Sequence, residues 1–267
     1  ELVTSVDTSG SGGADTPFYF KVNGLPVFMK GANYVPAVYL RGTTPPMSPV
    51  DIVAGAAEAG MNMLRVWGGG IYGSEEFYSS CDSLGILVWQ DFMFACAMYP
   101  WDDDFIRNVR EEAAQNVARI STHPCVALWC GNNENDEGWH NWGWQSAFDQ
   151  SQRKRISGGY DRVFHRLLPA AVERYGNGIP YHPSSPRFGR GDPRSLTEGD
   201  CHYWGVWHDA EPFEVLLEKT GRFMSEFGFQ SYPDPATLRS FASLRGDVVD
   251  REMIGCHQKH PRGDSLI

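Results

Sequence analysis

From about residue 18 onward, short apolar runs alternate along the chain with longer amphipathic segments. This alternation is typical of repeated strand–helix units. An Asn-Gly turn at 23–24 predicts a small hairpin between residues 18–22 and the first strand of the series. The runs predict seven strands, at 27–32, 61–67, 86–90, 126–129, 179–182, 201–204 and 222–225.

Capping signals define the expected helices between these strands. Ser48 followed by proline starts one helix that ends at Gly60, Ser74 starts a second that stops at Gly85, and Asp102 starts a third that runs to about 121. Residues beyond 132 are rich in Trp and Gly, which indicates a loop. Further helices are expected at 161–175, at 211–219 and once after residue 233, where a polar tail follows.

Seven strands, each followed by a helix or a long loop, predict an α/β fold: a TIM (β/α)₈ barrel that lacks its eighth βα unit. A doubly wound sheet is the competing fold, but the glycines that follow the strands do not form G-x-G-x-x-G, and the sequence has no P-loop. We expect residues 1–16 to be a linker or tail and residues 17–267 to form the barrel. An incomplete barrel exposes two strand edges, so we expect sequence beyond Ile267, or a second chain, to supply the remainder.

Composition excludes several classes of protein. The 267 residues carry a formal net charge of −10 and no run of basic residues, which argues against nucleic acid as a partner. No apolar stretch is long enough to cross a membrane. Nine Trp are many for this length, and indole rings on loops often form platforms for sugar rings, although core packing is their default role. The six Cys form no C-x-x-C pair and are expected to be free thiols, mostly buried.

Candidate chemistry gathers at the carboxyl ends of the expected strands, where barrel active sites are built. Carboxylates, imidazoles, an arginine and indoles stand there instead of a scatter of Lys, Ser and Thr. In strand order they are Asn33; Arg65 and Trp67; Trp89 and Asp91; Asn132, Asn133 and Glu134; His182; His202, Tyr203 and Trp204; and Ser225 and Glu226. This set of side chains is typical of a sugar-binding site.

Glu134 and Glu226 end strands that lie nearly opposite each other in such a barrel. Two facing carboxyl groups can serve as general acid and nucleophile on a glycosidic bond. We expect nearby Trp rings to raise the pKa of the acid, and Arg65 or the Tyr203 hydroxyl to keep the nucleophile ionised. Asp91 either binds substrate hydroxyls or is the buried partner of Arg65.

No metal or cofactor site is expected. The sequence has no H-E-x-x-H and no zinc spacing of Cys and His, and the acidic residues 102–104 directly precede a helix, where the helix dipole stabilises them. The remaining histidines are expected on loops and helix surfaces.

Several blocks of the chain resemble the β-mannosidase branch of glycoside hydrolase family two. The most specific of them is Arg-Val-Trp followed by three glycines at 65–70. The matching blocks are 30–33, 64–72, 88–96, 129–134, 202–207 and 222–231, and the resemblance runs from about Phe18 to Lys259.

This family is retaining, and the resemblance implies a role for each matching residue. Glu134 would be the acid/base, Glu226 the nucleophile with Tyr203 beside it, and Asn133 a contact to the sugar 2-hydroxyl. The candidate substrate-binding residues are Arg65, Trp67, Trp89, Asp91, Asn133, Trp142, His202, Trp204 and Trp207. Family members also carry upstream β-sandwich and immunoglobulin-like domains and an eighth barrel strand, which are not in this sequence, so we expect further domains or a second chain as partners.

The sequence therefore predicts a retaining hydrolase that removes terminal non-reducing β-D-mannose. Two alternatives remain open. One is another β-glycosidase of the same fold, of the endo-β-mannosidase, β-glucosidase or β-galactosidase type. The other is a non-catalytic carbohydrate-binding module, against which the retention of both glutamates speaks.

Overall fold

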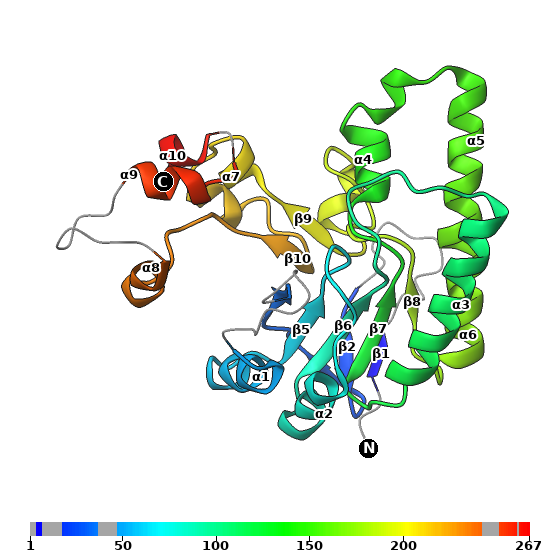
Figure 1. Cartoon of the computed structure of the whole chain (residues 1–267), viewed down its shortest axis with the longest axis horizontal. Helices are drawn as coiled ribbons and strands as arrows, with labels where there is room; N and C mark the ends of the chain where they lie inside the picture. Colours follow the sequence, from blue (N-terminus) through cyan, green and yellow to red (C-terminus); the bar gives the residue numbers. More distant parts are fainter. Residues whose placement is uncertain (1–3, 7–17, 37–46, 242–250, 261) are drawn as a thin grey trace. The chain divides into compact units, whose positions relative to one another are not determined.

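The computed structural model describes residues 4–6, 18–36, 47–241, 251–260 and 262–267, and it divides into two compact units. The first comprises Glu1–His202 and Gly221–Ser225, and the second comprises Tyr203–Thr220 and Glu226–Ile267. A five-stranded parallel sheet organises the first unit, with the strands in chain order (Figure 1). Its strands are β4 (Gly31–Tyr34), β5 (Met63–Val66), β6 (Leu87–Asp91), β7 (Val126–Cys130) and β8 (Tyr181–His182).

Helices between these strands cover one face of the sheet. They are α1 (Pro49–Glu58), α2 (Glu75–Leu84), α3 (Asp103–Ile120) and α6 (Leu168–Tyr175). Their apolar sides form one core with the sheet residues Leu64, Val66, Val88 and Trp129. The predicted caps are confirmed: the side chains of Ser48, Ser74 and Asp102 each accept a bond from the backbone N–H three residues later. Gly85 ends α2 in the left-handed conformation, at φ 69°.

A small antiparallel sheet packs on the first unit's core through its own aromatic residues. It consists of β1 (Thr4–Val6), β2 (Phe20–Val22) and β3 (Leu25–Val27). Phe18 and Phe20 pack with Met63, Leu87 and Trp89 in a second buried cluster. The predicted hairpin is therefore present, but its second strand ends at Val27, and the first parallel strand begins separately at Gly31.

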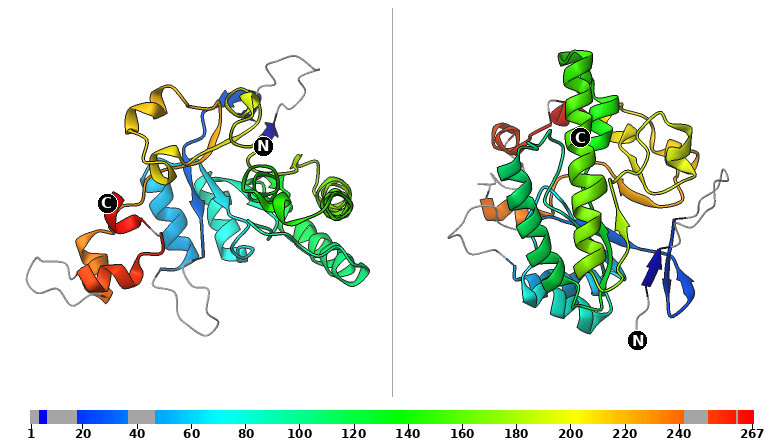
Figure 2. Two further views of the ribbon diagram at one scale, coloured as in Figure 1. Left: turned by 90° about the horizontal axis from the view of Figure 1, so that it is seen from above. Right: turned by 90° about the vertical axis from the view of Figure 1, so that its right-hand side faces the viewer.

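The segment after β7 is helical, so the prediction of a loop beyond residue 132 is wrong. It contains α4 (Asn135–Asn141), the short 3₁₀ turn η1 (Trp144–Ala147), α5 (Gln150–Tyr160) and the π-helical η2 (Asp161–Leu167), which leads into α6. Figure 2 shows α5, η2 and α6 as one long rod. The last part of this rod, 161–175, is the part that the sequence predicted.

The remaining elements differ from the prediction in length, position or number. β9 (Cys201–Tyr203) pairs with β10 (Met224–Phe227) in a two-stranded sheet, and η3 (Pro193–Leu196) precedes them. Instead of a helix at 211–219 the chain forms α7 (Gly205–His208) and η4 (Phe213–Leu217). The end of the chain carries three short helices where one was expected: α8 (Pro235–Phe241), α9 (Arg251–His257) and α10 (Gly263–Leu266).

Both the five-stranded and the two-stranded sheet are open among the described residues, so the α/β class is confirmed while barrel closure and the missing eighth unit stay predictions. Of the predicted tail 1–16, only Thr4–Val6 lie within the described residues, where they form β1. No described helix has the length and hydrophobicity needed to cross a bilayer. Four of the six thiols are buried, as expected, and Cys96 and Cys256 are exposed.

Candidate active site

A buried ion pair anchors the carboxyl ends of β5 and β6. Arg65 donates from Nη2 to Asp91 Oδ2 at 2.9 Å and from Nε to Oδ1 at 3.3 Å. Asp91 also accepts bonds from the indole N–H of Trp89 and from the backbone N–H of Gly68, and it is fully buried. Of the two alternatives for Asp91, the structure therefore shows the partner of Arg65. The expectation that Arg65 keeps the nucleophile ionised stays a prediction.

The same guanidinium fixes two asparagines at neighbouring strand ends. Nη2 of Arg65 donates to Asn133 Oδ1 at 2.8 Å, and Nη1 donates to Asn33 Oδ1 at 3.3 Å. Asn33 in turn donates to the backbone carbonyl of Ser225. Four strand ends are thus joined through one buried cation, and a planar guanidinium with five N–H groups suits this role better than a lysine does.

Glu134 occupies a strained position immediately after β7. Its backbone is left-handed, at φ 59°, which is costly for a residue with a side chain. Its N–H donates to the carbonyl of Ser185, and the buried Asn132 accepts from the backbone N–H of Asn135. These bonds hold the tight turn that presents the Glu134 carboxylate and starts α4.

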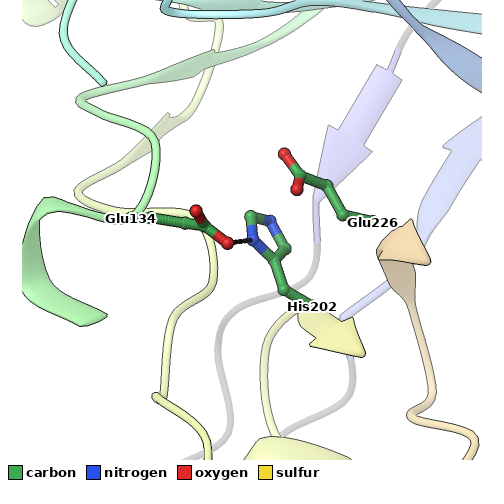
Figure 3. Close-up of side chains that lie close together, drawn as sticks. All are labelled: Glu134, His202 and Glu226. Atoms are coloured by element: carbon green, nitrogen blue, oxygen red, sulfur yellow. Dashed lines mark hydrogen bonds and ion pairs between the residues drawn. The ribbon is translucent and has the colours of Figure 1, made fainter. Parts of the chain in front are cut away.

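His202, on β9, is the direct partner of this carboxylate (Figure 3). Its Nδ1 lies 2.8 Å from Glu134 Oε1. Burial by itself raises the pKa of Glu134, but the hydrogen bond and charge of His202, aided by Cys96 and Arg65, hold the pKa of this carboxyl below its usual value. The expectation that Trp rings leave Glu134 with a raised pKa is therefore wrong for this state, because the imidazole outweighs burial.

The carboxylate of Asp200, close to His202, is fully buried. Asp200 accepts from His182 Nε2 at 2.8 Å, from the Ser185 hydroxyl at 2.6 Å, from the Ser225 hydroxyl at 2.5 Å and from the Arg187 backbone N–H at 2.9 Å. Burial opposes its charge, yet the bonds and charges of the histidines hold the pKa of Asp200 well below its ordinary range. Sequence reasoning did not select Asp200, although an acid directly before a strand was a usable signal.

Two groups approach the other ring nitrogen of His202. The Ser185 hydroxyl donates to Asp200, and its oxygen lies 2.8 Å from His202 Nε2. Arg65 Nη1, which can only donate, lies 3.5 Å from the same nitrogen. On the other side of the ring, the 2.8 Å contact between His202 Nδ1 and Glu134 Oε1 holds one shared proton.

Cys96 is a second residue that sequence reasoning passed over. Its thiol lies 3.5 Å from Glu134 Oε2, and Asn133 Nδ2 donates to its sulfur at 3.4 Å. The residue is exposed and left-handed, at φ 47°. The only sequence signal for Cys96 was its position in block 88–96, one of the blocks that resemble the family.

The second unit carries the other predicted catalytic residues. Trp204 donates its indole N–H to Glu226 Oε2 at 3.2 Å, and Glu226 is buried. The Tyr203 hydroxyl donates to Glu211, which also accepts from Lys219. Burial and the Glu211 carboxylate raise the pKa of Tyr203, so it remains a neutral donor.

The tryptophans predicted to bind substrate differ in exposure. Trp89 is buried against Phe18 and Phe223, and Trp207 is buried against Phe229 and His260, so both rings pack in cores. Trp67 is partly buried, with its ring against Gly69. Trp142, at the end of α4, is 44% exposed, and its ring packs edge-on against Trp144.

No family model matches the sequence. The beta-mannosidase of Bos taurus is 36% identical over 256 residues, covering 91% of this chain and 28% of that protein. Beta-mannosidase B of Aspergillus fumigatus is 36% identical over 242 residues, covering 89% of this chain and 28% of that protein.

The crystal structure of beta-D-mannosidase from Dictyoglomus thermophilum superposes with a TM-score of 0.80 at 40% identity, over 100% of this chain and 31% of that one. Parabacteroides merdae beta-glucuronidase, at 18% identity and a TM-score of 0.52, covers 81% of this chain and 24% of its own, and it is similar in fold alone. This chain thus spans about 28% of the length of the curated relatives it matches.

Proposed function

Because this chain is a β-mannosidase-like domain of glycoside hydrolase family two, as its sequence blocks predicted, we propose that it removes terminal non-reducing β-D-mannose from β-mannosides with retention of configuration. The observation that carries hydrolysis is the Glu134–His202 pair, one shared proton at the end of β7 beside the Arg65 cluster. The choice of mannose rests on the names of the relatives. We also infer that the strands from β4 to β10 are part of a (β/α)₈ barrel.

Glu226 is the proposed nucleophile. Its carboxylate attacks the anomeric carbon, the bond to the leaving oxygen breaks, and a glycosyl ester forms on Glu226. A water molecule then breaks this ester and releases mannose with its original configuration. A retaining enzyme needs about 5–5.5 Å between its two carboxyl groups. The indole N–H of Trp204 donates to Glu226 Oε2 and orients the carboxylate.

Glu134 is the proposed acid/base. In the first step it gives a proton to the leaving oxygen, and in the second it takes one from the attacking water. His202 Nδ1 lies 2.8 Å from Glu134 Oε1, so transfer of the proton between these two atoms converts the carboxylate into the acid. Ser185, which donates to Asp200, contacts His202 Nε2 and holds the imidazole in place during this exchange.

Labelling with a 2-deoxy-2-fluoro β-mannoside tests the assignment, because this sugar forms the glycosyl ester but hydrolyses it slowly. Peptide mapping of the natural polypeptide that carries residues 1–267 is expected to place the adduct on Glu226. Glu226→Ala is expected to abolish turnover, whereas the control Glu214→Ala, an exposed glutamate, keeps it. An adduct on Asp91 or Glu134 overturns the assignment, and faster turnover of aryl β-glucoside or β-galactoside than of aryl β-mannoside favours the alternative glycosidases.

A further inference from the structure

Two buried cysteines meet where the helix α2 contacts the chain just before the strand β7. Cys81 lies on α2, and Cys125 immediately precedes β7. Both belong to the main apolar core of the first unit, and they are 0% and 2% exposed. Their two thiols are hydrogen-bonded to each other. Neither sulfur has a part in the catalytic steps proposed above.

Several bonds hold the turn that carries Cys125 on α2. One oxygen of Asp82 accepts from the backbone N–H of Cys125 at 2.9 Å, and the other contacts His123 Nδ1 at 2.7 Å. The thiol of Cys125 donates to the backbone carbonyl of Tyr78 at 3.7 Å. In an α-helix the side chain of Cys81 lies over the preceding turn, to which Tyr78 belongs. These contacts bring both sulfurs to the same place on α2, independently of the bond between the thiols.

The surroundings of the pair determine when it can react. The thiolate is the form of cysteine that attacks a disulfide. The hydrogen bond with Cys81, burial and the nearby carboxylate of Asp82 raise the pKa of the Cys125 thiol. This thiol therefore stays protonated while the core is closed. We expect the pair to react during folding, or when α2 opens locally from the turn.

We propose that Cys81 and Cys125 are a modification site: they form a disulfide bond with each other when the protein meets a small-molecule disulfide such as oxidised glutathione. One cysteine, as thiolate, attacks the glutathione disulfide, which leaves a mixed disulfide on the protein and releases one glutathione thiolate. The second cysteine, as thiolate, attacks the protein sulfur of this mixed disulfide and releases the second glutathione. The two cysteines together lose two electrons and two protons, and the glutathione disulfide gains them as it becomes two thiols.

The bond changes the stability of the first unit and leaves its chemistry alone. It encloses residues 81–125, which contain β6 and α3. A cross-link of this length lowers the conformational entropy of the unfolded chain, and the expected rise in Tm is roughly 5–15 °C. Cys125 precedes β7 and Glu134 follows it, so the bond lies at the opposite end of the strand from the site. The inference therefore does not depend on the proposed function.

Peptide mapping of the natural polypeptide that carries residues 1–267 tests the bond. The protein is held with oxidised glutathione in urea just below its unfolding transition, where local opening exposes the pair. It is then fully unfolded, its free thiols are blocked with N-ethylmaleimide, and it is digested with trypsin without reduction. The bond is expected to join the peptides 66–107 and 120–153. The fragmentation spectrum of the linked peptide is expected to place the bond between Cys81 and Cys125, and it needs no variant to do so.

Matched variants separate this pair from the other thiols of the same two peptides, Cys96 and Cys130. The linked peptide is expected to be absent from Cys81→Ser and to persist in Cys130→Ser, which also replaces a buried thiol. A link that persists in Cys81→Ser, or wild-type protein with both Cys81 and Cys125 alkylated, overturns the proposal. Dithiothreitol is expected to lower the Tm of the oxidised wild type by roughly 5–15 °C more than that of Cys81→Ser. Equal effects on the two proteins overturn the stabilising role.

Discussion

Replacement of Asp200 by asparagine tests whether the buried carboxylate stabilises the strand ends that carry the site. The side chain is fully buried and accepts four hydrogen bonds, from two hydroxyls, one imidazole and one backbone N–H. Asparagine has the same shape, and both serine hydroxyls can rotate to accept from its NH₂ group. All four contacts therefore persist in Asp200→Asn, but without the negative charge.

The expected loss follows from the strength of these bonds. A hydrogen bond to a charged group contributes about 1.5–3 kcal/mol and a neutral one about 1 kcal/mol. Four bonds, each weaker by about 1 kcal/mol, lower the free energy of unfolding by about 4 kcal/mol. The control Asp192→Asn, also a carboxylate with a lowered pKa, is expected to lose far less, because it is partly exposed and pairs with Arg194 in solvent.

The pH dependence identifies charge as the cause. Because the pKa of Asp200 is lower in the folded protein than in the unfolded chain, its stabilisation is full above the unfolded value of about 3.9 and is lost as pH falls toward the folded value. Urea unfolding followed by tryptophan fluorescence is expected to give a constant difference between wild type and Asp200→Asn from pH 5 to 7. Below about pH 3.9 the difference shrinks by about 1.4 kcal/mol per pH unit. A difference below 1 kcal/mol, or one that is unchanged down to pH 3, refutes the reasoning.

Two further predictions concern Glu134 and its neighbour. In Glu134→Ala, turnover of activated aryl mannosides is expected to survive far better than turnover of mannobiose, and azide is expected to restore activity with a β-configured product; equal losses on both substrates exclude the acid/base role. Alkylation of Cys96 by N-ethylmaleimide is expected to inactivate the enzyme by crowding Glu134. Cys96→Ser is expected to retain activity in the presence of the reagent, whereas the control Cys256→Ser remains as sensitive as wild type. Inactivation of Cys96→Ser at the wild-type rate contradicts this prediction.

The sequence predicts those parts of the fold whose signals are local. Ser48, Ser74 and Asp102 cap the helices that they were expected to cap, because the bond from a cap side chain spans only three residues. The helix α5 was missed because its residues have no apolar stripe and include two consecutive glycines. Its support comes from a capping box between Asp149 and Gln152 and from the close approach of the Trp101 ring at Gly159.

Side-chain partners within the site were less predictable than its residues. The structure brings together Glu134, His202, Arg65 and Asp91, which the sequence placed at strand ends, and their roles stay predictions. The bond between Glu134 and His202, however, spans 68 residues, and no sequence pattern specifies which carboxylate an imidazole meets. The lowered pKa of Glu134 depends on that pairing. The expectation of a raised pKa, which rested on nearby tryptophans, therefore had the wrong sign.

The strained backbone at Glu134 explains how three consecutive residues serve three different surroundings. Asn133 extends from β7 and binds Arg65, Glu134 turns its carboxylate to His202, and Asn135 begins α4 and accepts from the backbone N–H of Ala97. A left-handed residue costs on the order of 1–2 kcal/mol. The bonds from Glu134 N–H to Ser185 and from Asn135 N–H to Asn132 offset this cost. One unfavourable torsion thus gives three consecutive side chains three different sets of partners.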